Sequence, residues 1–455
     1  MKIKINKIYA VLFLAVLIVG TYFFVTDSLV LKKIAGYNVP KTTSTPSPSA
    51  DGKLDFLTLP PGFSISVFAD NLINPRVIAF DSKGRMFVSE TKAGRVVSLT
   101  DADNDGLAEK KTVILENRKS PHGLAFYTDP KTKKVYLYVA ETYQVSRFEY
   151  DVSKGTLMNT IGKNIANLPA DGMHFTRTIA FGRNFREEQI IGGKSEVDTQ
   201  VPMKLYISVG SSCDVCVETE TWKRASILES DPEGKYTAEF AGGLRNSVFF
   251  AFHPETDEIW ATDMGRDNLG DELPPDEINI VKVATEEHKF GARRYGWPFC
   301  YGDKIRDKTF NPTKVDRVDI SADCSQTEAP LIEIPAHSAP LGLAFIDSNK
   351  WPGGWAGDLL VAYHGSWNRS EPVGYKIVRF NLDKNGNLQQ PKNQDGEDFL
   401  TGFFDPSARS TDSGQAGPGQ GAIIGRPVDL KFGPDGALYI SDDSAGLIYR
   451  VVPTK

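Results

Sequence analysis

A four-part pattern recurs six times along this chain and limits the fold more than any other feature of the sequence. Each copy holds a short strand with a phenylalanine near its end, a turn, a second strand, a loop and a third strand. The first strands of the six copies begin at Pro75, Pro121, Arg177, Arg245, Pro340 and Arg426. A fourth apolar stretch precedes every first strand, and six four-stranded units are the signature of a six-bladed β-propeller.

The earliest of these apolar stretches, residues 65–70, comes before any complete unit. We therefore expect it to pair with the last blade and close the ring, because closure removes exposed sheet edges. The predicted fold is all-β, with the propeller occupying residues 56–455. An ordinary β-sandwich would not explain six repeats of one four-part order.

Residues 1–30 are predicted to form a transmembrane signal anchor. Lys2, Lys4 and Lys7 precede an uncharged, mostly apolar run over residues 8–25 that is about long enough to span a membrane. A cleaved signal peptide is the alternative, although no cleavage site of small residues follows clearly. Either segment exports the chain, so we expect an extracytoplasmic protein, anchored by a transmembrane helix. Residues 31–55, rich in Pro, Ser and Thr, are predicted to form a flexible linker.

Charge and cysteine content narrow the partners and the compartment. The formal net charge is -6, which gives the binding of nucleic acid little electrostatic support. Four cysteines in an exported chain indicate two disulfides, Cys213 with Cys216 and Cys300 with Cys324. A CxxC pair can also serve zinc or redox chemistry, so the sequence leaves the connectivity open.

The blade topology sorts the loops into two faces. In an up-and-down blade, loops that lead into first strands share a face with loops that join second to third strands. These loops are rich in His, Arg and Asn, whereas most turns on the other face are bland. Loops on a rigid scaffold are the usual location of binding and catalysis, so we expect a site at this mouth of the central channel.

Two kinds of polar residue on this face suggest chemistry. His174 lies three residues before a first strand and could act as a general base, or could only hydrogen-bond to a neighbouring blade. His122 and His337 hold equivalent positions, and His364 lies in a loop of the same face. The cationic and amide donors of this rim are Arg245, Asn246, Arg369 and Arg426. They would suit an anionic ligand with several carboxylates, with salt bridges between blades as the alternative.

Two acidic segments suggest cation sites. The first contributes the carboxylates of Asp101, Asp103 and Asp105. Its start is that of a calcium loop, but Thr112 stands where an EF-hand places its bidentate glutamate, and an Asx-rich surface turn is the alternative. The second runs from Gly265 and offers backbone carbonyls together with Asp276 and Glu277. A solvated acidic loop is the alternative for this segment.

Several ordered motifs lie in these loops and the strands beside them: MHFTRTIAFG from Met173, GLRN from Gly243, DEINIV from Asp276 and YGWP from Tyr295. Together they resemble the soluble pyrroloquinoline quinone (PQQ)-dependent glucose and sorbosone dehydrogenases, also called aldose sugar dehydrogenases. The resemblance spans most of the propeller. It implies an enzyme that oxidises an aldose, or a related polyol or aldehyde hydrate, with PQQ and calcium as cofactors and an unidentified electron acceptor.

The resemblance also implies roles for individual residues at the cofactor. His174 would take the proton of the substrate hydroxyl while hydride passes from the adjacent carbon to the quinone. Arg245 and Asn246 would contact the cofactor and stabilise its developing negative charge. Arg369 and Arg426 would pair with its carboxylates.

For metal, the resemblance implies that the carbonyls of Gly265 and Arg266 hold a calcium ion that polarises the quinone. Glu277 resembles a ligand of a second, structural calcium site. The chain also departs from the family's glucose enzymes, which have proline where Arg266 stands. Met173 replaces an acidic neighbour of the base, and a glutamine near the substrate is replaced around Pro121. These departures affect the expected sugar specificity more than cofactor binding.

Two other functions fit a propeller. A calcium-dependent lactonase-type hydrolase would activate water, but it needs a cluster of carboxylate ligands on the channel axis, where this face offers His and Arg. A non-catalytic extracytoplasmic binding module would share the fold, because folds of this kind host many functions. The binding module predicts no uptake of cofactor.

Overall fold

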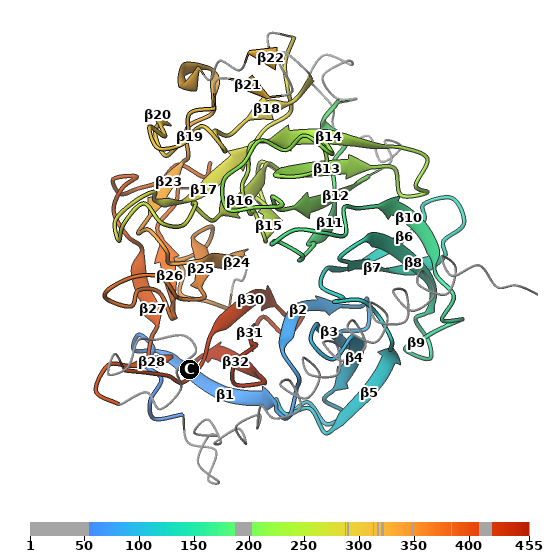
Figure 1. Cartoon of the computed structure of the whole chain (residues 1–455). Helices are drawn as coiled ribbons and strands as arrows, with labels where there is room; N and C mark the ends of the chain where they lie inside the picture. Colours follow the sequence, from blue (N-terminus) through green and yellow to red (C-terminus); the bar gives the residue numbers. More distant parts are fainter. Residues whose placement is uncertain are drawn as a thin grey trace, which may run out of the picture. The chain divides into compact units, whose positions relative to one another are not determined.

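The computed structural model describes residues 54–186, 203–286, 288, 291–312, 314–315, 318–319, 323–346, 350–383, 385–408 and 421–454. Six main antiparallel sheets follow one another around a central axis (Figure 1). The six-bladed β-propeller predicted from the repeat is therefore confirmed, and each predicted apolar stretch forms a strand of its blade.

The first three blades follow directly in the chain. Blade 1 contains β2 (Pro75–Phe80), β3 (Met86–Glu90), β4 (Arg95–Thr100) and β5 (Lys110–Leu115). Blade 2 contains β6 (Leu124–Thr128), β7 (Val135–Glu141), β8 (Gln144–Asp151) and β10 (Lys163–Asn167), with the short β9 (Thr156–Leu157) beside β8. Blade 3 contains β11 (Ile179–Gly182), β12 (Lys204–Val209), β13 (Ser226–Ser230) and β14 (Thr237–Gly242).

The last three blades include the strand that closes the ring. Blade 4 contains β15 (Phe250–Phe252), β16 (Ile259–Asp263), β17 (Asp276–Val281) and β23 (Ile332–Ile334). Blade 5 contains β24 (Pro340–Phe345), β25 (Leu359–Tyr363), β26 (Lys376–Phe380) and β27 (Glu397–Leu400). Blade 6 contains β30 (Pro427–Phe432), β31 (Leu438–Asp442), β32 (Leu447–Pro453) and the N-terminal β1 (Phe63–Ala69). Because β1 pairs antiparallel with β32, the predicted closure is confirmed.

Insertions between the blade strands carry the remaining elements. The insertion between β17 and β23 holds β18 (Arg293–Arg294), β19 (Cys300–Tyr301), β20 (Ile305–Arg306), β21 (Lys314–Val315), β22 (Val318–Asp319) and a 3-10 helix at Cys324–Gln326. In it, β18 pairs in parallel with β14 and so adds a strand to blade 3. The short strands β28 (Phe404–Asp405) and β29 (Ala422–Ile423) pair with each other.

The inner strands approach one another backbone to backbone, which explains two glycines of the repeat. A Cβ at Gly342 in β24 would lie 2.4 Å from the carbonyl oxygen of Val428 in β30. A Cβ at Gly123, just before β6, would lie 2.5 Å from the carbonyl oxygen of Arg177. Contacts this short exclude any side chain, so the glycines allow the first strands to pack tightly around the axis.

Aromatic side chains fill the space between blades. Phe87 of blade 1 contacts Phe126 and Tyr150 of blade 2, with ring centroids 5.1 and 5.7 Å away. The Tyr150 hydroxyl donates to Asp81 at 2.6 Å, so the phenol is paired where it leaves water. Such layers hold each blade against the next and give the loops a rigid base.

Both predicted disulfides are confirmed, Cys213 with Cys216 and Cys300 with Cys324. No helix among the described residues is long and apolar enough to cross a membrane. The predicted anchor over residues 1–30 lies outside the described residues, as does nearly all of the predicted linker.

Candidate active site at the channel mouth

A cavity of about 340 Å³ opens among the loops that were expected to share one face of the propeller. Its walls come from blades 1, 3, 4, 5 and 6, and they include His174, Asn246 and Arg426 together with Arg76 and Asp443. The volume falls at the lower end of the range for small-molecule sites, about 300–1,000 Å³. The structure therefore brings three of the predicted site residues together around one small cavity.

Buried carboxylates at the ends of second strands hold the loops that lead into first strands. In four blades of the described chain these acids are Glu90, Glu141, Asp263 and Asp442. Asp263 accepts the backbone N–H groups of Arg245 and Asn246 at 2.9 and 2.7 Å, and Asp442 accepts that of Arg426 at 2.9 Å. In these four blades the first strand thus starts from a fixed backbone, and the side chains just before it have defined positions.

His174 lies in the loop between β10 and β11, and its ring orientation is set by Ser211. Nδ1 lies 3.0 Å from both the carbonyl oxygen and the hydroxyl of Ser211. Because a carbonyl oxygen only accepts, Nδ1 carries the proton and donates, which leaves a lone pair on Nε2. Burial, together with the charge of Arg245, lowers the pKa of His174 to about 3 from the usual 6.5. At neutral pH the ring is an uncharged hydrogen-bond acceptor at the cavity wall.

Arg177 fixes the backbone that carries His174. Its side chain is fully buried and donates to the carbonyl oxygens of His174, Thr176 and Pro169 at 2.8, 2.7 and 2.9 Å. Burial lowers the pKa of Arg177 to about 9, but the guanidinium remains charged at neutral pH. Arg177 is therefore a structural support for the loop.

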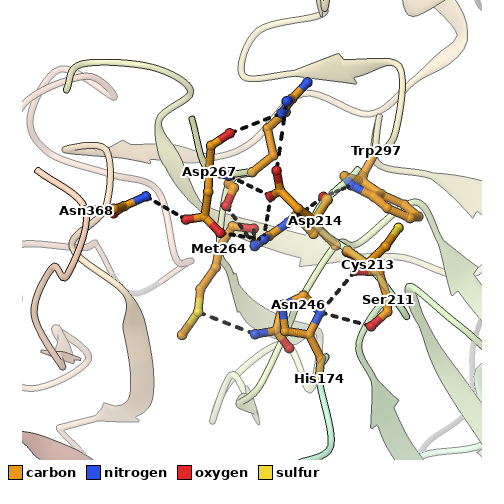
Figure 2. Close-up of polar contacts among 12 residues, drawn as sticks. His174, Ser211, Cys213, Asp214, Asn246, Met264, Asp267, Trp297 and Asn368 are labelled. Atoms are coloured by element: carbon orange, nitrogen blue, oxygen red, sulfur yellow. Dashed lines mark hydrogen bonds and ion pairs between the residues drawn. The ribbon is translucent and has the colours of Figure 1, made fainter. Parts of the chain in front are cut away.

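Arg245 lies in a cluster of oxygen acceptors beside the cavity, and three residues of that cluster, Asp214, Met264 and Asp267, are labelled in Figure 2. Its guanidinium contacts carboxylate oxygens of Asp214 and Asp267 at 2.8 and 3.2 Å. It also donates to the carbonyl oxygens of Gly265 at 2.8 Å and Met264 at 3.3 Å. The side chain is 5% exposed, so the charge is buried against two carboxylates. The predicted cofactor contact by Arg245 remains a prediction.

Asn246 has a weaker partner than its neighbour. Its amide nitrogen donates to the thioether sulfur of Met264 at 3.4 Å, and both side chains line the cavity. Thioether sulfur is a poor acceptor. An oxygen atom of a ligand in the cavity would be a better partner for this N–H group. Glycine at position 210 leaves room for the Asn246 side chain, because a Cβ there would lie 2.5 Å from Asn246 Oδ1.

Positive charge dominates the ionic groups of the cavity wall, although the chain as a whole is acidic. Arg76, Lys92 and Arg426 line it, against the single carboxylate of Asp443 among its described lining residues. Asp443 is itself paired with Arg76 at 2.7 Å and with His364 Nε2 at 3.0 Å. Burial would raise the pKa of Asp443, but His364 and Arg76 outweigh it and lower that pKa. Arg76 Nε is buried without a hydrogen-bond partner among the described residues.

Arg369, Gly265 and Arg266 lie outside the walls described for this cavity. Arg369 donates to the carbonyl oxygen of Ala336 and pairs with Glu272. Gly265 offers its carbonyl oxygen to Arg245, and Arg266 pairs with Asp307 at 2.8 Å. The structure thus separates Arg369 from Arg426, which the resemblance had assigned to the same cofactor groups.

A second, much smaller cavity of about 30 Å³ lies beside Glu277, with Gly265 and Arg266 also in its lining. Glu277 accepts the backbone N–H of Gly302 at 2.7 Å and the amide of Asn279 at 3.0 Å. Burial, with a contribution from Asp263, raises the pKa of Glu277 to about 8. Burial also raises the pKa values of Asp263 and Asp276 to about 7. The metal role of Glu277 stays a prediction.

Asp101, Asp103 and Asp105 lie in the loop between β4 and β5, on the opposite face from His174. Together with Glu109, their carboxylates come within 4.8 Å of one another. Asp101 also caps its own turn by accepting the backbone N–H of Asp105 and Gly106. The geometry is compatible with both alternatives, a cation loop and an Asx-rich turn, so the calcium assignment stays a prediction.

Sequence reasoning singled out neither Arg76 nor Asp443. A signal was present, because Asn74 and Arg76 lie where the chain enters the first strand of blade 1, as Asn246 and Val248 do in blade 4. Asp443 follows the second strand of blade 6, where the same face was expected. Of the other histidines, His122 is fully buried and lies outside the described cavity wall.

The fold and the cavity define a propeller with a neutral, oriented histidine beside a cationic pocket. The chain belongs to the TrAA12-like family, whose sequence profile matches residues 57–454. The family resemblance inferred from the motifs is confirmed by this match and by the relatives.

Three similar proteins illustrate the relationship. An uncharacterized protein of Borreliella burgdorferi is 29% identical over 88% of this chain and 91% of its own length. A pyrroloquinoline quinone-dependent pyranose dehydrogenase of Coprinopsis cinerea is 23% identical over 86% of this chain, and the match spans 54% of that protein. The holo form of the PQQ domain of pyranose dehydrogenase from Coprinopsis cinerea superposes with a TM-score of 0.66 at 21% identity, covering 87% of this chain and 97% of that one.

Proposed function

We propose that this protein is a PQQ-dependent oxidoreductase that oxidises a hydroxyl-bearing carbon of a sugar, an aldose or a related polyol or aldehyde hydrate. The observation that carries the proposal is the pairing of His174, uncharged and oriented through Nδ1, with a cavity lined by Arg76, Lys92 and Arg426. Similarity to the pyrroloquinoline quinone-dependent pyranose dehydrogenase of Coprinopsis cinerea, and to the PQQ domain of that enzyme, supports the cofactor assignment.

The residues of the cavity fit PQQ, a flat quinone with several carboxylates. Arg76, Lys92 and Arg426 would hold the carboxylates, since guanidinium and ammonium groups bind them through charge-assisted hydrogen bonds. Arg76 Nε is buried without a partner among the described residues and so has a donor to offer. The apolar side chains of Val248 and Leu341 also line the cavity and would face the rings.

When bound, PQQ supplies a quinone that accepts a hydride from the substrate carbon. His174 Nε2 accepts the proton of the substrate hydroxyl, and Ser211 stabilises the resulting imidazolium through Nδ1–H. Asn246 offers an N–H group to an oxygen in the cavity.

The calcium ion for which we propose a place beside the active site is a structural one at Glu277. Arg245 already donates to the carbonyl oxygens of Met264 and Gly265, so a guanidinium faces the oxygen that the resemblance assigns to calcium. The roles proposed for His174 and Asn246 do not use an ion at Gly265. The small cavity beside Glu277 offers carboxylate and carbonyl oxygens of the kind that calcium prefers, and we propose a structural ion there.

A lactonase-type hydrolase is less well supported. Among the described residues that line the cavity, Asp443 is the single carboxylate, and Arg76 and His364 already bind it. We further propose that the chain is exported and anchored by residues 1–30, and that an unidentified acceptor takes the electrons.

The test is reconstitution of the full chain with PQQ and calcium, followed by dye reduction with a panel of sugars. We expect reduction that depends on both PQQ and sugar. The absence of PQQ-dependent reduction, together with no spectral sign of PQQ binding, would refute the proposal. That result would favour the binding module instead, because the binding module predicts no uptake of cofactor.

A further inference from the structure

The loop between β12 and β13 contacts both His174 and Arg245, and the Cys213–Cys216 disulfide lies within it. On the histidine side, Ser211 accepts from Nδ1 of His174 through its carbonyl oxygen at 3.0 Å. The Ser211 hydroxyl in turn donates to the carbonyl oxygen of Cys213 at 2.6 Å. Ser211, which orients the ring of His174, is therefore hydrogen-bonded directly to a cysteine of the disulfide.

On the arginine side, Asp214 at the tip of the disulfide loop gathers several donors (Figure 2). Its carboxylate accepts from Arg245 Nη2 at 2.8 Å and from the backbone N–H of Asp267 at 2.7 Å. Its carbonyl oxygen accepts from Arg245 Nε at 2.9 Å and from the indole N–H of Trp297 at 3.1 Å. One residue thus holds the loop before β15, the loop after β16 and the insertion together.

The disulfide supplies the rigidity that these contacts need. The segment from Ser211 to Cys216 contains no strand or helix, so sheet hydrogen bonds do not fix it. A covalent ring that closes over a sequence separation of 3 leaves the enclosed backbone few conformations. Outside the ring, Glu218 accepts from the backbone N–H and hydroxyl of Ser212 at 2.6 and 3.0 Å.

The geometry points to Asp214 as a positioning residue, held by the Cys213–Cys216 disulfide so that one short loop orients both His174 and the guanidinium of Arg245. This inference rests on the proposed function, because the orientation matters for the proton acceptor of that reaction. Asp214 is not among the described residues that line the cavity. It acts through Arg245 directly and through the disulfide loop on Ser211.

Two variants test the inference, each in the full chain. Cys213→Ala/Cys216→Ala opens the loop, and Asp214→Asn keeps its size while removing its charge. Since misplacement of a reacting group by about 1 Å costs about 100-fold, we expect kcat to fall roughly 10- to 100-fold in both variants. KM for sugar and the affinity for PQQ should change little, because Arg76, Lys92 and Arg426 are left intact.

The matched control is Cys300→Ala/Cys324→Ala, which opens a disulfide with a sequence separation of 24. Because a disulfide that closes a longer loop contributes more stability, this control should lower Tm more than Cys213→Ala/Cys216→Ala does. It should nevertheless retain more activity. Equal or larger loss of kcat in the control would overturn the inference and reduce the first disulfide to a stabilising bridge.

A readout without cofactor separates this inference from the proposed function. With nitrogen-15 histidine in the PQQ-free protein, NMR reports which ring nitrogen carries the proton for each of the 6 histidines. We expect His174 as the Nδ1–H tautomer in the wild type and in the Cys300→Ala/Cys324→Ala control, and a mixture of tautomers in Cys213→Ala/Cys216→Ala. An unchanged tautomer would refute the positioning role even if turnover falls. A wild type without turnover would refute the proposed function, while the tautomer result would still decide this one.

Discussion

Removal of His174 tests the proton acceptor on which the proposed reaction depends. His174→Ala deletes the Nε2 lone pair at the cavity wall and leaves Arg76, Lys92 and Arg426 in place. We therefore expect turnover to fall while PQQ affinity stays near that of the wild type. A matched control is His337→Ala, since Nε2 of His337 donates to the carbonyl oxygen of Gly270 at 2.8 Å and His337 is not among the described residues that line the cavity.

The size of the loss follows from the environment of the ring. A positioned general base contributes about 10²- to 10⁴-fold, or about 3–5 kcal/mol of barrier. Burial and Arg245 lower the pKa of His174 to about 3, so Nε2 is a weaker base than an ordinary imidazole. Because catalytic efficiency follows basicity, we expect the lower half of that range, about 10²- to 10³-fold in kcat.

The same pKa predicts the pH profile. A histidine with the ordinary value of about 6.5 loses its free base about tenfold per pH unit below that point. His174 has its pKa lowered to about 3, so it stays uncharged through pH 5 in the cofactor-free protein. Protonation of His174 should therefore impose no fall in kcat/KM as pH decreases from 8 to 5.

The assay combines steady-state dye reduction at saturating PQQ from pH 4 to 8 with PQQ binding followed by tryptophan fluorescence. Histidine NMR on the cofactor-free protein supplies the pKa of His174 directly. The reasoning is refuted by a kcat for His174→Ala within about tenfold of the wild type, below the smallest general-base effect. A titration of His174 near 6.5 would refute the electrostatic part alone.

Other variants test the remaining features. Arg426→Gln should weaken PQQ binding about 10- to 100-fold, because it removes a charged hydrogen bond of about 1.5–3 kcal/mol. Arg369→Gln should weaken PQQ binding less, because Arg369 pairs with Glu272. Calorimetry of PQQ binding compares the two variants. Calcium should raise the Tm of the wild type but not of Glu277→Gln. Without calcium, burial raises the pKa of Glu277, so the free energy of unfolding of the wild type should fall as pH rises from about 5 to 8. Glu277→Gln lacks this titration and should gain stability relative to the wild type by at most about 1.4 kcal/mol per pH unit. Urea titrations measure the difference, and a difference that does not change with pH would contradict this prediction. Gly342→Ala should destabilise the fold by about 1–3 kcal/mol by overpacking against β30, which thermal unfolding measures.

The sequence predicted the fold well because strand order repeats and a repeat carries its own register. Two features recur between blades because the same contacts recur. The glycine of PHGLAF and PLGLAF allows the close approach of a neighbouring first strand, and the acid at the end of several second strands accepts backbone N–H groups of the next loop. A loop position is therefore transferable between blades, which is why His174, Asn246 and Arg426 could be assigned to one face.

The direction of a long side chain is not transferable in this way. The guanidinium of Arg245 lies against Asp214, a residue 31 positions earlier in another loop, and the sequence did not predict this partner. Arg369 likewise pairs with Glu272, 97 positions away. Partners so distant in sequence are chosen by tertiary packing of irregular loops, for which a repeat pattern carries no information.

The buried acids that fix the loops also explain how an acidic chain presents a cationic cavity. The carboxylate oxygens of Asp263 and Asp442 accept backbone N–H groups, and burial raises the pKa values of these acids to about 7 and about 6. Their negative charge is thus partly neutralised by protons and compensated by peptide dipoles. Arg426, in contrast, emerges from the backbone that Asp442 holds and keeps its charge at the cavity wall. The buried acids that hold the loops therefore add little negative charge at the cavity, and the arginines of the cavity wall make its electrostatic potential favourable for an anionic ligand.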